Sequence, residues 1–87
     1  SWPAILSGIV QARCKEASIS PRFVATRAEI DMLITWWLST DRGIEPDLRL
    51  LQGWRREIAG QDILSWLSGE TSVVVDSSSA GIKIEYN

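Results

Sequence analysis

Histidine is absent from this 87-residue sequence, and cysteine occurs only once, at Cys14. A zinc site needs several histidine or cysteine ligands, and a disulfide needs two cysteines, so neither can form within the chain. Such sparse use of cysteine is typical of proteins from a reducing compartment. We therefore predict a cytoplasmic location.

Long apolar runs and strong positive charge are also missing. No segment approaches the ~20 apolar residues of a transmembrane helix, and the N-terminus lacks the basic and apolar regions of a secretion signal. We therefore expect no membrane association. The formal net charge of −2 excludes a strongly basic nucleic-acid binder. Any contact with RNA or DNA must use a local patch and should be weak and salt-sensitive.

The usual groups of a catalytic site are missing as well. There is no histidine to activate a serine, and no glycine-rich phosphate loop that ends in lysine. The closest carboxylates, in Glu29-Ile30-Asp31 and Glu45-Pro46-Asp47, stand where helices are predicted to begin, and acidic residues are favoured there by the helix dipole. A two-metal nuclease site needs several carboxylates in one pocket, so we interpret these pairs as structural. We predict that the chain is not an enzyme by itself and that it holds no metal or cofactor.

Tryptophan, by contrast, is abundant, with five residues in this short chain. Each indole can bury about 150–250 Å², so these rings could supply much of the core of one small domain spanning residues 1–87. The alternative is that one ring is exposed on a contact surface. We expect Trp54 to be buried at the centre of the domain and Trp66 to be partly exposed.

Apolar residues at helical spacing predict a first helix from Ala4 to about Ala17, with Cys14 on its buried stripe. The segment Ser18–Pro21 should end this helix, because proline disfavours helical geometry in the residue before it. Residues 22–25 then form a short apolar connector, which we expect to insert into the core.

A second helix is predicted from about Arg27 to Leu38. Its start is marked by a capping box, in which the side chains of Thr26 and Glu29 each accept a hydrogen bond from the other's backbone amide. Residues 39–46 are polar and rich in turn formers, so they predict a loop.

The second half of the chain predicts two more helices and a hairpin. A third helix should start near Asp47, bend at Gly53 and stop at Gly60, and a short fourth helix should cover Gln61–Ser68 before Gly69. The third helix has one apolar face, formed by Leu50, Leu51, Trp54 and Ile58.

Two β-prone segments, 72–75 and 82–86, flank a serine-rich turn at 77–81. A two-stranded hairpin is marginal alone, so it should pack on the helices or pair with a partner. The predicted fold class is therefore all-α, with a helical part at about 4–69 and a small C-terminal β-hairpin at about 71–87.

Five arginines are the candidate nucleic-acid-binding residues: Arg22, Arg27, Arg49, Arg55 and Arg56. Two or three guanidinium groups that converge could bind phosphates, and Arg27 lies in the first helical turn, beside free backbone amides. The alternative is that Arg55 and Arg56 pair on the surface with neighbouring acids. The candidates for such pairing are Glu57, Asp47 and Asp62.

Two stretches of the sequence resemble a known family. They are Ile19-Ser20-Pro21-Arg22-Phe23-Val24-Ala25-Thr26-Arg27-Ala28-Glu29-Ile30 and Leu50-Leu51-Gln52-Gly53-Trp54-Arg55-Arg56-Glu57, followed by Gly60 and Leu67-Ser68-Gly69-Glu70. Together they are similar to the helicase-and-RNase-D C-terminal (HRDC) domain in the C-terminal region of bacterial ribonuclease D-like proteins. The resemblance covers about residues 5–70 and extends into the β-prone tail.

The resemblance implies a compact bundle of about five short helices attached to a 3′–5′ exonuclease domain of the two-metal carboxylate class. The catalytic acids and the divalent metal would belong to that domain of the parent protein, outside this chain. In this family the HRDC domain is thought to help engage RNA, such as tRNA precursors with extra 3′ nucleotides. The related helicase domains bind DNA or partner proteins.

Two functions are compatible with these patterns. The first is an accessory, non-catalytic nucleic-acid-binding domain of a ribonuclease D-like exoribonuclease that processes tRNA 3′ ends. The second is a protein-interaction or spacer module that packs on the catalytic domain of the parent chain or on a second copy. The abundance of tryptophan, the acidic balance and the apolar hairpin motivate the second.

Overall fold

The computed structural model describes the backbone of residues 1–76 and 81–87. Its elements in chain order are α1 (Trp2–Ala17), η1 (Pro21–Phe23), α2 (Arg27–Leu38), η2 (Arg49–Leu51), α3 (Gly53–Arg55), η3 (Arg56–Gly60), α4 (Gln61–Leu67), β1 (Thr71–Asp76) and β2 (Gly81–Tyr86). The predicted helical fold with a C-terminal hairpin is confirmed. Within the described residues the helices form three segments, α1, α2 and the run from α3 to α4, which is fewer than expected. Apart from Gly81, the predicted turn lies outside the described residues.

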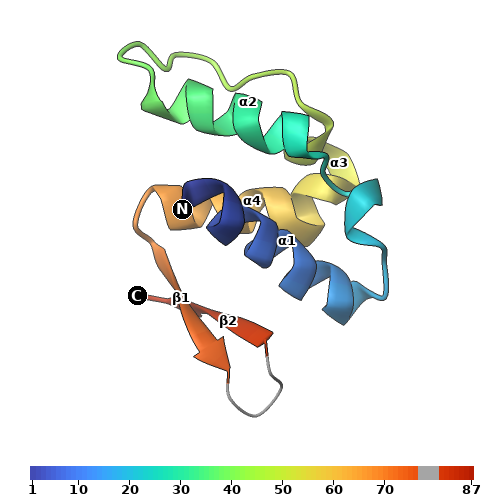
Figure 1. Cartoon of the computed structure of the whole chain (residues 1–87). Helices are drawn as coiled ribbons and strands as arrows, with labels where there is room; N and C mark the ends of the chain where they lie inside the picture. Colours follow the sequence, from blue (N-terminus) through green and yellow to red (C-terminus); the bar gives the residue numbers. More distant parts are fainter. Residues whose placement is uncertain (77–80) are drawn as a thin grey trace.

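Helix α1 lies at the centre of the molecule (Figure 1). Helix α2 runs back along one side of it, and the run from α3 to α4 packs on another side. The hairpin covers α1 on the side away from α2, with β2 in contact with the helix. The loop between α2 and η2 returns along the outside of α2 (Figure 1).

The core of this arrangement is aliphatic. Its buried side chains are Leu6, Ile9, Val10, Cys14, Val24, Ile30, Leu33, Leu48, Leu50, Leu51, Ala59 and Ile63. The prediction of a buried Trp54 is wrong, because this side chain is 44% exposed, and no tryptophan is among the buried core residues that the structure describes. Ala59 is fully buried, and a Cβ atom at Gly60 would overlap the Leu50 carbonyl oxygen, so the backbones pack too closely at this point to admit an indole.

Helix α1 buries the predicted stripe, and it begins two residues earlier than expected because Pro3 fits the first helical turn. It ends at Ser18, whose backbone is left-handed (φ 58°, ψ 42°) and whose amide donates to the carbonyls of Cys14 and Lys15. Burial raises the pKa of the Cys14 thiol, as expected for a structural cysteine rather than a nucleophile.

The predicted capping box at the start of α2 is confirmed. Thr26 Oγ1 accepts from the Glu29 amide, and Glu29 Oε1 accepts from the Thr26 amide, both at 3.2 Å. The Glu29 carboxylate is buried, and its second oxygen accepts from the Leu50 amide at 3.2 Å. One carboxylate therefore caps α2 and also fastens η2 to it, which confirms the structural interpretation of Glu29.

The chain that follows the loop differs from the prediction. No helix starts at Asp47, because Leu48 and Gln52 have extended backbones on either side of the short η2 turn. Gly53, with φ +53°, does more than bend a helix, since it begins a new one. Positive φ costs little for glycine, so this residue suits the sharp change of direction.

The prediction that Gly60 stops the helix is wrong. Gly60 lies inside the helical run from α3 to α4. A Cβ atom at this position would overlap the backbone carbonyl oxygen of Leu50. Glycine is needed here because η2 crosses the helix at backbone contact. The helix instead ends at Leu67, and Gly69 follows at φ 85°, as predicted.

The hairpin pairs antiparallel, from Thr71 opposite Tyr86 to Asp76 opposite Gly81. Tyr86 donates its hydroxyl hydrogen to Asp62 of α4 at 3.4 Å, and Asp62 also accepts from Arg13 Nε of α1 at 2.8 Å. The hairpin therefore packs on the helices, as its marginal stability predicted.

Candidate nucleic-acid interface

Three of the five candidate arginines are held by carboxylates. The nitrogen-to-oxygen distances are 3.1 Å for Arg27 to Asp31, 3.6 Å for Arg49 to Glu29 and 2.6 Å for Arg56 to Glu45. An arginine in such a pair must exchange its carboxylate for a phosphate, so these three are less available to a nucleic acid than an arginine without an acidic partner.

Arg56 forms the shortest of these pairs. Its guanidinium also donates to the second oxygen of Glu45 at 3.2 Å and to the carbonyl of Leu51 at 3.1 Å. The hydrogen bond from Arg56 lowers the pKa of the Glu45 carboxyl. The pairing expected for Arg56 is present, but its acid comes from the loop after α2 and not from Glu57, Asp47 or Asp62.

Arg22 and Arg55 lie together elsewhere on the surface. Arg55 Nε donates to the backbone carbonyl of Phe23 at 2.8 Å, and its guanidinium lies 4.3 Å from the centre of the Trp54 ring. The guanidinium of Arg22 lies 5.2 Å from the centre of the Phe23 ring. Neither arginine forms an ion pair with a side chain that the structure describes. We call these four residues the aromatic–arginine surface.

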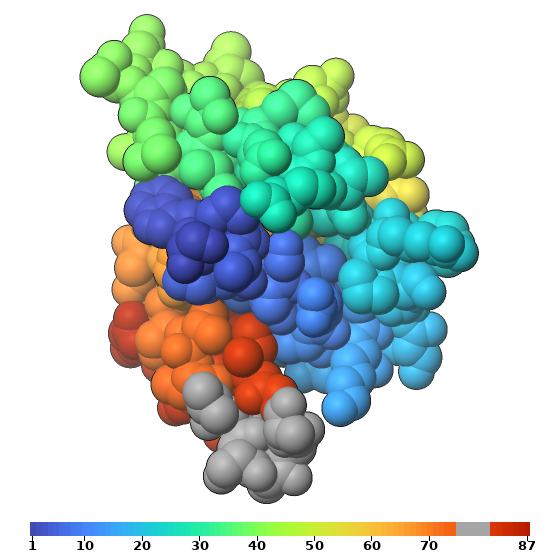
Figure 2. Space-filling model, in the orientation of Figure 1, coloured from blue at the N-terminus to red at the C-terminus, as the bar shows by residue number. Residues whose placement is uncertain are grey.

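Both rings of the aromatic–arginine surface are open to solvent, with Phe23 56% and Trp54 44% exposed. Val24 is buried in the core, whereas its neighbour Phe23 is not. The prediction that the connector inserts into the core is therefore confirmed for Val24 and wrong for Phe23. In the space-filling view the connector (cyan) protrudes beside the chain that follows the loop (yellow; Figure 2). Tertiary contact thus joins two segments that are 32 residues apart.

This surface has the chemistry to bind a single-stranded nucleic acid. Exposed aromatic faces stack on bases, and guanidinium groups donate to phosphates. Both arginines were predicted to bind nucleic acid, but both rings were predicted to lie in the core, because apolar side chains are more often buried. A local signal for the surface was present, since an arginine directly adjoins an aromatic residue in Arg22-Phe23 and in Trp54-Arg55.

The remaining candidates are placed less favourably. Arg27 and Arg22 line one shallow hollow together with Gln11 of α1, so Arg27 lies at the margin of the aromatic–arginine surface. Trp66 is half-buried, as predicted, and it meets Trp2 edge to face, with 6.1 Å between ring centres.

The described ranges contain no group of three or more acidic, histidine or cysteine side chains that could hold a metal ion. None of the helices described in the structure combines the length and the apolar character needed to cross a bilayer.

Residues 4–63 match the family described as "Ribonuclease D, C-terminal HRDC domain". The chain belongs to this family. It is 36% identical over 75 residues to a ribonuclease D of Gluconacetobacter diazotrophicus, which covers 86% of the chain and 17% of that protein. It is 32% identical over 73 residues to a ribonuclease D of Granulibacter bethesdensis, which covers 84% of the chain and 17% of that protein. No solved structure is significantly similar.

The chain spans about a sixth of the length of the two ribonuclease D relatives that it matches. The matched range contains α1 from Ala4 onward, α2 and the helices up to Ile63, and therefore all four residues of the aromatic–arginine surface. The hairpin lies beyond the matched range, although both relatives align over most of the chain.

Proposed function

We propose that this chain is an accessory nucleic-acid-binding domain of a ribonuclease D-like 3′–5′ exoribonuclease that acts in RNA processing, including that of tRNA 3′ ends. The domain itself is non-catalytic in this proposal. The chemistry and any divalent metal belong to a catalytic domain of a longer parent chain. Family membership and the name of both relatives support the parent activity.

One observation carries the binding role. Arg22 and Arg55, which have no acidic partner among the described residues, converge on Phe23 and are flanked by exposed aromatic faces. Each ring can stack on a base, while the adjoining guanidinium donates to the phosphate of the same or the next nucleotide. Because this surface offers two cations among the described residues, binding is weak, and it falls with salt only as far as about two phosphate contacts require.

The test is fluorescence anisotropy of a labelled single-stranded oligoribonucleotide at several salt concentrations. Reversing both charges, with Arg22→Glu and Arg55→Glu, should remove about two phosphate contacts, which lowers the slope of log affinity against log salt by roughly 1 to 1.5. Phe23→Ala should weaken binding by about 1–3 kcal/mol while leaving that slope nearly unchanged, because stacking is not ionic.

Arg42 offers a matched control. Its guanidinium lies 3.9 Å from the centre of the Trp37 ring, in the loop after α2, so Arg42→Glu reverses one exposed arginine on an aromatic ring, as Arg22→Glu does. Only Arg22→Glu should weaken binding. Equal losses from both variants, or no binding at low salt, would contradict the proposal.

A second function is favoured by a separate observation. Leu38 and Ile44, at the end of α2 and in the following loop, are 64% and 92% exposed. Exposed apolar side chains mark a protein contact when they form one contiguous patch. The chain would then be an interaction or spacer module that packs on the catalytic domain of the parent protein or on a second copy.

Sedimentation velocity distinguishes the two possible partners of such a module, which are a second copy of the chain and the catalytic domain of the parent protein. Self-association that Ile44→Asp abolishes would support a second copy, and association with added ribonuclease D catalytic domain would support the parent. A monomer at all concentrations, with no affinity for the catalytic domain, would eliminate this second function.

A further inference from the structure

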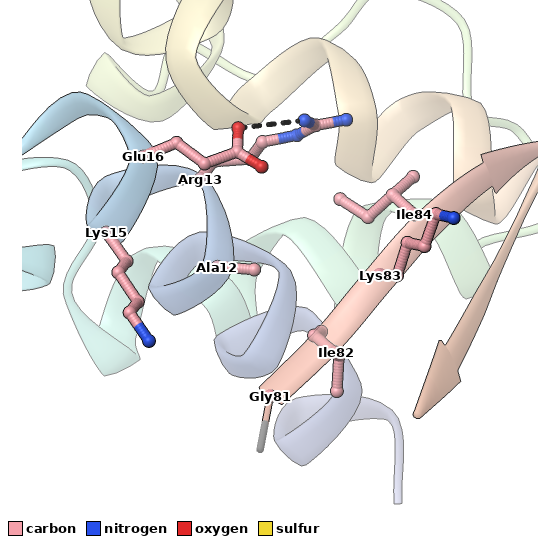
Figure 3. Close-up of a pocket in the computed structure, with 8 residues that line it drawn as sticks. All are labelled: Ala12, Arg13, Lys15, Glu16, Gly81, Ile82, Lys83 and Ile84. Carbon is pink, nitrogen blue, oxygen red and sulfur yellow. Dashed lines mark hydrogen bonds and ion pairs between the residues drawn. The ribbon is translucent and has the colours of Figure 1, made fainter. Parts of the chain in front are cut away.

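The second β-strand has one edge that the hairpin itself does not use. Within residues 1–76 and 81–87, β2 pairs only with β1, so alternate N–H and C=O groups on its other edge lack a strand partner there. That edge faces α1, because β2 lies between α1 and β1 (Figure 3). In the described part of the chain no backbone group outside β1 bonds to β2.

A groove of about 600 Å³ separates this strand edge from the C-terminal half of α1. Its wall on the strand side is continuous from Gly81 to Ile84, and its wall on the helix side runs from Ala12 to Glu16 (Figure 3). Because a strand rises about 3.3 Å per residue, a partner that pairs with four residues needs roughly 13 Å of open edge. The groove thus has the shape of a site between a helix and an open strand.

The charge of the groove is opposite to that of the chain. Three basic side chains line it, Arg13, Lys15 and Lys83, against one acid, Glu16, in a protein of net charge −2. Glu16 is held by Arg13 at 3.1 Å. Lys15 forms no ion pair with any described side chain. The floor between the cations is apolar, since Ala12, Ile82 and Ile84 contribute to it.

We propose that this groove binds an extended acidic peptide, which adds to the open edge of β2 as a third strand. The peptide backbone pairs with β2, its apolar side chains pack beside Ile82 and Ile84, and its carboxylates meet Lys15 and Lys83. A nucleic acid is disfavoured here because a polynucleotide cannot continue the strand ladder and because none of the described residues that line the groove is aromatic, so bases have no ring on which to stack. This site is separate from the aromatic–arginine surface and does not depend on RNA binding.

The test is an NMR titration of the ¹⁵N-labelled chain with a blocked peptide in which valine alternates with glutamate. Saturable shifts at the amides of residues 12–16 and 81–84 are expected. Lys15→Glu with Lys83→Glu should weaken binding roughly tenfold or more, since two exposed attractions become repulsions. Arg22→Glu with Arg42→Glu makes the same change in net charge away from the groove and should leave the affinity unchanged.

Modified peptides keep the test independent of any protein variant. Methylating alternate peptide nitrogens on the paired side should abolish binding, because those groups can no longer donate to β2, and replacing glutamate by lysine should abolish it through charge repulsion. The proposal is overturned if no saturable binding occurs, if the shifts lie elsewhere or if the methylated peptide binds equally well. It is also overturned if an oligoribonucleotide produces the same shifts, or if the chain dimerises through β2 so that a second copy fills the groove.

Discussion

Residues 1–38 and residues 47–67 are both mainly helical, but they differ in whether local sequence signals or long-range contacts decide their backbone. In the first, the elements begin and end at local signals, which are Pro3 in the first turn of α1, Ser18 after its last residue and the capping box of Thr26. In the second, long-range contacts decide the backbone, because η2 is fastened to Glu29 and crosses the helix at Gly60. Local signals predict α1 and α2 well although other elements pack on them, and they fail where a second backbone passes at contact distance, as at Gly60.

Gly60→Ala should have the largest effect, because the new methyl group would overlap the Leu50 carbonyl. We expect a loss of about 3 kcal/mol or more in the free energy of unfolding, which exceeds the ~1 kcal/mol that alanine gains over glycine in a helix. Urea denaturation followed by circular dichroism measures the change.

Gly53→Ala is the matched control, since a Cβ atom there would meet no described atom within 4 Å apart from its own neighbours in the chain. Only the positive φ is strained, so the expected loss is about 1–2 kcal/mol. If both variants lose the same free energy of unfolding, the close approach of the Leu50 backbone to Gly60 is not what makes Gly60 necessary.

Glu29→Ala tests the link between the two segments. It removes the side-chain part of the capping box and leaves the buried Leu50 amide without its acceptor. We expect a loss of about 2–4 kcal/mol, because an unsatisfied buried amide adds to the lost cap. Thr26→Ala removes the cap but keeps the bond to Leu50, and should cost about 1 kcal/mol. If both variants lose the same amount, Glu29 acts only locally.

Glu45→Gln should have the smallest effect on the free energy of unfolding, and this effect should depend on pH. Arg56 lowers the folded pKa of Glu45, so the pair stabilises the fold above the unfolded pKa of about 4.3, and this contribution is lost as the pH falls through the folded pKa. The side chain is largely in water, so the loss at pH 7 is only about 0.5 kcal/mol. Urea unfolding at neutral and acid pH should show the two proteins converging at acid pH. A constant difference would assign the effect to something other than the ion pair.

Adjacent arginines show how much of the candidate site the sequence contains. Arg55 and Arg56 are equivalent in the sequence, and both were candidates for phosphate binding. In the structure Arg55 contacts Phe23 and Trp54, whereas Arg56 is held by Glu45. Their long-range partners come from segments 32 and 11 residues away, so the only local difference between the two arginines is that Arg55 adjoins Trp54.

The sequence by itself determined the helix α2 and its cap, the buried stripe of α1 and the pairing of the hairpin, because each depends on residues close in the chain. Only the tertiary structure decided that Trp54 lies at the surface, that Gly60 continues a helix and that Arg22 and Arg55 meet at Phe23. The physical reason is close packing. The distance between two packed backbones decides whether a large ring can fit between them. That distance depends on how the helices assemble and not on the sequence of any one helix.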